Sequence, residues 1–98
     1  MVGRRGVRRA PRDYAADGAA WPDTPTDGPP EAEAARLIAL RLGEAIGGHS
    51  LRAVARDAGL DHTTLSAVLA GRRWPDLVTV VRLERALNCD LWPRHGET

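Results

Sequence analysis

Several residue types are missing or scarce in this chain, and the scarcity of cysteine and of long apolar runs excludes some classes of protein. All 14 basic residues are arginine, and phenylalanine is absent as well as lysine. The single cysteine, Cys89, excludes an internal disulfide and suits a reducing compartment, and we interpret it as a small apolar core residue. No apolar run approaches the roughly 18 residues of a membrane span, and residues 1–11 lack the apolar middle of a secretion signal. The sequence therefore predicts a cytoplasmic protein with no membrane partner.

Residues suited to catalysis or metal binding are present, but their spacing suits neither. His49, His62 and His95 are scattered along the chain, and none has metal-ligand spacing with Cys89. No nucleophile is paired with a base, no glycine-rich phosphate loop follows a strand pattern, and no paired carboxylates are evident. We therefore predict no enzyme activity, no metal site and no cofactor.

The composition changes once along the chain, near residue 30. Residues 1–30 contain five of the seven prolines and few periodic apolar residues, which predicts a disordered or loosely ordered N-terminal arm. Five arginines precede Asp13, and this basic tip suits either a solvated tail or an arm that grips phosphates or enters a minor groove. Tyr14 and Trp21 are candidates to dock on the domain or on a partner. We expect one domain over 31–93 and a tail over 94–98.

The middle of the chain has the pattern of two short helices joined by a tight turn. Apolar residues recur at helical spacing over 51–58 and restart over 62–70. Ser50 and Asp61 precede these runs and can accept the free N–H groups of a first turn, so we predict that both are N-caps. Gly59 lies where the first helix ends, in a position that suits a left-handed backbone.

Two further helices are expected on either side of this pair. The first covers 31–46 and ends at Gly47. The last begins after Asp76, which is placed as its N-cap, and ends at Asn88. Leu91 and Trp92 then either fold back on the core or begin one short turn before Pro93. The floor of the core is expected to come from the apolar residues of this last helix, which are Leu77, Val80, Val81, Leu83 and Leu87.

These residues resemble the helix-turn-helix of the Cro and xenobiotic-response-element (XRE) repressors, over roughly 31–93. The chain departs from the family at Leu69, where many members carry a glutamate, and near Leu51, where the best-known phage repressors place a phosphate-binding glutamine. The resemblance implies an all-α, compact four- to five-helix domain of the lambda-repressor-like fold behind a flexible arm. The positions that match the family's spacing are Ala55, Gly59, Leu60, Leu65, Gly71, Arg72 and Pro75.

The resemblance also implies that the helix over 62–70 enters the major groove of double-stranded DNA. Because Leu65 and Val68 must face the core, the side chains between them face outward. Those at the start of the helix can bond base edges, but none is an arginine or a glutamine, so we expect modest sequence specificity. Affinity should come instead from phosphate contacts. The candidate DNA-binding residues are Arg52, His62, Thr63, Thr64, Ser66, Ala67, Arg72 and Arg73.

The function that follows is a bacterial or phage transcriptional regulator, and a repressor is our prediction. The resemblance implies a homodimer on a pseudo-palindromic site, associated with the nucleoid. The charge balance favours a different class of function, because residues 31–98 hold nine arginines and nine acids and are neutral. The alternative is a protein-interaction module, such as the antitoxin partner of a toxin, that uses the same fold with weak DNA binding.

Overall fold

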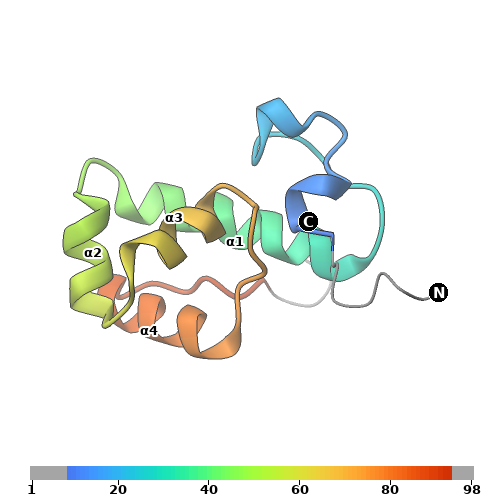
Figure 1. Cartoon of the computed structure of the whole chain (residues 1–98). Helices are drawn as coiled ribbons and strands as arrows, with labels where there is room; N and C mark the ends of the chain where they lie inside the picture. The colour runs from blue at the N-terminus through green and yellow to red at the C-terminus, as the bar shows by residue number, and fades with distance from the viewer. Residues whose placement is uncertain (1–8, 94–98) are drawn as a thin grey trace, which may run out of the picture.

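The computed structural model describes residues 9–93, and within that range the fold is all-helical (Figure 1), which confirms the predicted fold class. A single antiparallel bridge joins Ala15 to Thr26 in this part of the chain. Two short 3-10 helices precede four α-helices. Their bounds are η1 Pro11–Tyr14, η2 Gly18–Ala20, α1 Pro30–Ile46, α2 Leu51–Ala58, α3 His62–Leu69 and α4 Leu77–Leu87.

Side-chain caps fix where α2, α3 and α4 begin. Ser50, Asp61 and Asp76 each accept a hydrogen bond from a backbone N–H two or three residues further on, at 3.3, 3.3 and 2.7 Å. Each cap satisfies an N–H group that has no partner inside its helix. The three predicted N-caps are therefore confirmed, and the predicted helix bounds agree with the structure to within one residue.

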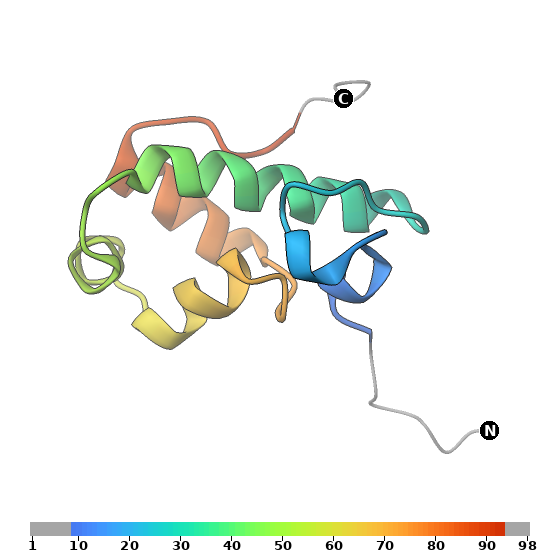
Figure 2. The ribbon, with the colours of Figure 1, turned by 90° about the horizontal axis from the view of Figure 1, so that it is seen from above.

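The core lies where α1 meets the other helices. Ile38 and Leu42 of α1 are buried against Leu65 of α3 and Leu83 of α4. The segment after α4 runs back along α1 (Figures 1 and 2) and places Leu91 in the same cluster with no exposed surface. The prediction that Leu91 folds back on the core is thus confirmed.

The prediction that Leu77 and Val81 of α4 belong to the floor of the core is wrong, because both are exposed. Leu77 is 64% exposed and Val81 is 38% exposed, whereas Val80 and Leu83 are fully buried. Since successive residues of a helix are rotated by about 100°, Val81 turns out of the stripe that Val80 and Leu83 define. The outer face of α4 therefore exposes apolar side chains in its first turns, next to the exposed Arg82 and Arg85. Trp92, which we also expected on the core, is 43% exposed.

The N-terminal segment differs from the expected arm in the part that the structure describes. Residues 9–29 contain η1 and η2 and lie beside the first half of α1 (Figure 2), against which η1 packs. Pro11 is buried. The segment is held by contacts with residues far along the chain, and local periodicity carries no signal for such contacts. The arginines before residue 9 and the tail over 94–98 lie outside the described residues.

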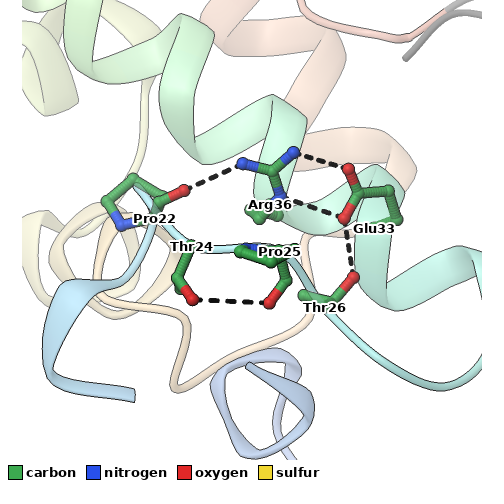
Figure 3. Close-up of polar contacts among 6 residues, drawn as sticks. All are labelled: Pro22, Thr24, Pro25, Thr26, Glu33 and Arg36. Carbon is green, nitrogen blue, oxygen red and sulfur yellow. Dashed lines mark hydrogen bonds and ion pairs between the residues drawn. The ribbon is translucent and has the colours of Figure 1, made fainter. Parts of the chain in front are cut away.

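An ion pair on α1 fastens this segment to the domain (Figure 3). The guanidinium of Arg36 donates two hydrogen bonds to the carboxylate of Glu33, at 2.9 and 2.6 Å, and a third to the carbonyl of Pro22, at 3.1 Å. The hydroxyl of Thr26 donates to the same carboxylate at 2.6 Å. These bonds lower the pKa of Glu33 from 4.5 to about 2, the one from Arg36 most of all. The pair thus holds the chain at two points, residues 22 and 26.

Candidate nucleic-acid interface

The turn between α2 and α3 is built around Gly59, which adopts a left-handed backbone with φ 72° and ψ 34°, as predicted. The N–H of Gly59 donates to the carbonyl of Arg56 at 3.1 Å, and the N–H of Leu60 donates to that of Ala55 at 2.8 Å. This pair of bonds is a Schellman motif, which satisfies carbonyls at the end of α2. From α4, Arg82 donates to the carbonyl of Gly59 at 3.0 Å and ties the turn to the domain.

α3 has one buried face and one open face. Leu65 and Val68 lie in the core, so the prediction that they face inward is confirmed. On the opposite side Thr63 is exposed, and the other candidate base-reading positions are half-buried. No described segment lies across α3 in the view of Figure 1. A polar helix face is therefore accessible over its first two turns, and its candidate residues are His62, Thr63, Ser66 and Ala67.

The first turn of α3 carries a fixed negative charge. Hydrogen bonds from Thr63 hold the pKa of Asp61 below its ordinary value, so the carboxylate is ionised at neutral pH. The Nδ1 atom of His62 lies 3.8 Å from Asp61 Oδ1. This carboxylate therefore stabilises the start of α3 and lies beside the first candidate base-reading side chain.

The predicted phosphate-binding arginines lie on the surface. Arg52 is exposed in the first turn of α2, and Arg72 and Arg73 are exposed directly after α3. None of their side chains forms a hydrogen bond or ion pair with another residue in 9–93. Thr64, on the flank of α3, is half-buried. Three guanidinium groups at the two ends of the α2–α3 pair thus keep their donors available.

The end of α3 is completed by the N-terminal segment. Gly71 adopts a left-handed backbone with φ 75°, and the N–H of Arg72 donates to the carbonyl of Ala67 at 3.0 Å. The carbonyl of Leu69 accepts a hydrogen bond from the indole N–H of Trp21 at 3.0 Å. Carbonyls of the last turn have no partner inside the helix, so Trp21 replaces water at the end of α3.

Other residues that dock the N-terminal segment were only partly predicted. The sequence raised Tyr14 and Trp21 as docking candidates but gave no role in docking to Arg9, Arg12 or Trp74. The indole of Trp74 donates to the carbonyl of Arg9 at 2.8 Å, and its ring centroid lies 6.4 Å from that of Tyr14. Aromatic residues inside a proline-rich segment were the available signal, because such side chains seldom stay in water when an apolar surface is near.

Cys89 and the acidic residues of the described range have no arrangement typical of a metal or redox site. Burial raises the pKa of the Cys89 thiol, and the nearby carboxylates of Glu84 and Asp90 raise it further. No group of three or more potential metal ligands is found among residues 9–93. Within the same range, none of the helices has the length and apolar character needed to cross a bilayer.

Comparison with known protein families gives a match over the helix-turn-helix region. A family model described as helix-turn-helix matches residues 39–91, just over half of the chain. The matched range contains α2, the turn at Gly59, α3 and α4. Neither a curated protein nor a solved structure matches the chain.

Proposed function

Because this chain belongs to the Cro/C1-type helix-turn-helix family of DNA-binding regulators, we propose that it is a transcriptional repressor that inserts α3 into the major groove of double-stranded DNA. The open polar face of α3, opposite Leu65 and Val68, is the observation that carries this proposal. A helix of about 10–12 Å diameter with its side chains fits the major groove, and helices of this motif read base edges with their N-terminal residues.

Base reading is assigned to the start of α3. His62 can donate to or accept from a purine edge, Thr63 can bond a base or offer its methyl group to thymine, and Ser66 can bond either way. Ala67 contributes a small apolar contact surface. Because none of these side chains makes the bidentate contact that gives about 1–3 kcal/mol of discrimination, we expect specificity to be modest for one protomer.

Phosphate binding is assigned to Arg52, Thr64, Arg72 and Arg73. The three arginines have exposed guanidinium groups that form no hydrogen bond with another residue in 9–93, and a guanidinium can bind a phosphate through two parallel hydrogen bonds. These contacts fix the position of the helix on the duplex and carry no sequence information by themselves. Affinity is therefore expected to depend strongly on salt.

The test measures the affinity of the full chain for a labelled genomic duplex across a salt series. Neutralising three or four phosphates with each protomer predicts a slope of log affinity against log salt near −3 to −4 for each bound protomer. The double variant Arg72→Ala with Arg73→Ala should flatten that slope by about 2. Arg85→Ala, which removes an exposed arginine near the C-terminal end of α4, is the matched control. Because Arg85 lies at helical spacing from Val78 and Val81, its mass is checked by sedimentation, and with the mass of the wild type it should bind as the wild type does. Binding that does not respond to salt, or that survives the double substitution, would overturn the assignment.

The exposed apolar residues of α4 favour a protein-binding role in addition to DNA binding. Leu77 and Val78 are 64% and 58% exposed, and exposed apolar groups of this size are typical of protein interfaces. We propose that the first occupant is a second copy of the chain, which gives the homodimer that a pseudo-palindromic site requires. A toxin-type partner is the alternative, and failure of the full chain to bind any genomic duplex at low salt would favour it.

A further inference from the structure

The corner of the molecule that follows α3 carries more positive charge than α3 itself. Arg72 and Arg73 are exposed there, and residues 9–12 of the N-terminal segment bring two more exposed arginines to the same place. In Figure 1, η1 lies next to the loop that follows α3. These four arginines are Arg9, Arg12, Arg72 and Arg73, and we call the surface that they form the corner.

Backbone and indole hydrogen bonds hold the two pieces of chain side by side. The N–H of Arg12 donates to the carbonyl of Gly71 at 2.9 Å, and the indole of Trp74 donates to the carbonyl of Arg9 at 2.8 Å. One contact lies at each end of residues 9–12 and of residues 71–74. Arg9 is thus held beside Trp74, and Arg12 beside Gly71, although about sixty residues of sequence separate the two pieces of chain.

The guanidinium groups of the segment are positioned without being neutralised. Arg9 donates to the carbonyl of Asp13 at 2.7 Å and lies 4.3 Å from the ring centroid of Tyr14, while Arg12 donates from Nε to the carbonyl of Gly18 at 3.0 Å. Each guanidinium has five N–H donors, so most donors stay available. Neither side chain forms an ion pair with a described residue.

Two acids near this corner each accept a hydrogen bond from a backbone N–H group. Asp13 accepts a hydrogen bond from the backbone N–H of Ala10 at 2.8 Å, and Asp76 caps α4 by accepting from Thr79 at 2.7 Å. Both carboxylates lie close enough to reduce the local field, and Arg73 interacts electrostatically with Asp76. Asp17, which caps η2 and precedes the Gly18 carbonyl that Arg12 contacts, is a third acid near the corner. The four arginines still outnumber these three acids.

We propose that residues 9–12 are part of the DNA interface, and that Arg9 and Arg12 bind phosphates on the strand that Arg72 and Arg73 also contact. This inference rests on the proposed function, and it adds a second chain segment to the site. Because the segment is already docked, binding need not order it, and the entropic cost of a free arm is avoided. Phosphates are the expected ligands, since a planar guanidinium matches their geometry and the corner lies beyond the first turns of α3.

The test uses a double variant of the full chain that carries both Arg9→Ala and Arg12→Ala. Its DNA binding is compared with that of the wild type and of Arg85→Ala. Fluorescence anisotropy is measured on a labelled mixed-sequence duplex of about 20 base pairs, roughly two helical turns. Loss of two phosphate contacts should flatten the salt slope by about 2 and weaken binding by at least roughly tenfold at 0.1 M salt. Base preference should not change, because the lost contacts read no bases.

A charge-retaining variant separates binding from docking. Arg9→Lys with Arg12→Lys should recover the wild-type salt slope, since an ammonium neutralises a phosphate as a point charge. A change in tryptophan emission relative to the wild type, on top of the contribution of the exposed Trp92, reports whether Trp21 and Trp74 stay docked. If the wild type binds and the alanine double variant binds like Arg85→Ala, this inference is overturned and the proposed function stands. If the wild type shows no salt-dependent binding, both are overturned.

Discussion

A single glycine determines whether the N-terminal segment can dock on α3. At Gly71 the backbone has φ 75°, and an added Cβ would lie 2.6 Å from an indole carbon of Trp21 and 2.9 Å from the Cβ of Arg12. A side chain there meets both a left-handed backbone and the packed segment. Gly71 is therefore required by the conformation of the chain and by the close approach of two pieces of it.

Gly71→Ala is predicted to destabilise the fold by at least about 1–2 kcal/mol, the cost of a left-handed backbone for a residue with a Cβ. Gly43→Ala is the matched control, because an added Cβ on that exposed position of α1 meets no atom within 4 Å. The control should gain about 0.5–1 kcal/mol from better helix propensity. Urea unfolding followed by circular dichroism measures both. Equal stability of the two variants would contradict the packing of Trp21 against Gly71.

At the scale of the element, the predicted helices followed from local chemistry. The caps at Ser50, Asp61 and Asp76 and the glycine at 59 each determine a helix end through groups only a few residues away, so the sequence shows them directly. The docking of residues 9–29 could not be predicted in the same way. It depends on the indole of Trp21 reaching a carbonyl 48 residues away, and no periodicity encodes such a contact.

The ion pair that fastens this segment to α1 predicts a dependence of stability on pH. The pKa of Glu33 is lowered from 4.5 to about 2 in the folded chain, first of all by the hydrogen bond from Arg36. The folded state therefore binds this proton less readily than the unfolded state. The stabilisation is fully present above pH 4.5 and is lost as pH falls toward 2. Since the Glu33 side chain is 32% exposed, solvent screening reduces the contribution to on the order of 1–2 kcal/mol.

Measurement of the free energy of unfolding between pH 7 and pH 2 for wild type and Glu33→Gln tests this prediction. The difference between the two proteins should be largest at neutral pH and should shrink below pH 4.5. Glu44→Gln removes an exposed carboxylate from the same helix and should follow the wild type throughout. A Glu33 difference that persists unchanged at pH 2 would show that the ion pair does not hold the segment.

For the whole molecule, a formal net charge of +1 conceals an uneven distribution. The neutral balance of residues 31–98 lowered the expectation of tight DNA binding. The fold, however, brings Arg9 and Arg12 next to Arg72 and Arg73, and this juxtaposition is long-range, so a count of charges along the chain could not reveal it. The outward face of α3 could be predicted because it follows from the positions of Leu65 and Val68 alone.

The outer face of α4, with its exposed apolar side chains, gives the last prediction, which concerns assembly. Leu77, Val78 and Val81 are 64%, 58% and 38% exposed, and burial of such groups by a second copy recovers about 25 cal/mol per Å² of apolar area. The wild type is therefore expected to sediment as a dimer. Val78→Asp places a charge in the middle of this face and should give a monomer. Because each protomer then reads only half of the site, the variant should also bind a genomic duplex more weakly.

Analytical ultracentrifugation with and without duplex measures both effects. Ala16→Asp adds the same charge to an exposed position of the N-terminal segment and should leave the dimer intact. If the wild type is a dimer and Val78→Asp sediments with the same mass, the outer face of α4 is not the interface. If the wild type is monomeric alone but binds the duplex as two copies, the dimer forms only on DNA. In that case Val78→Asp should abolish the second binding event, because the α4 contact would then form only when DNA holds two protomers together.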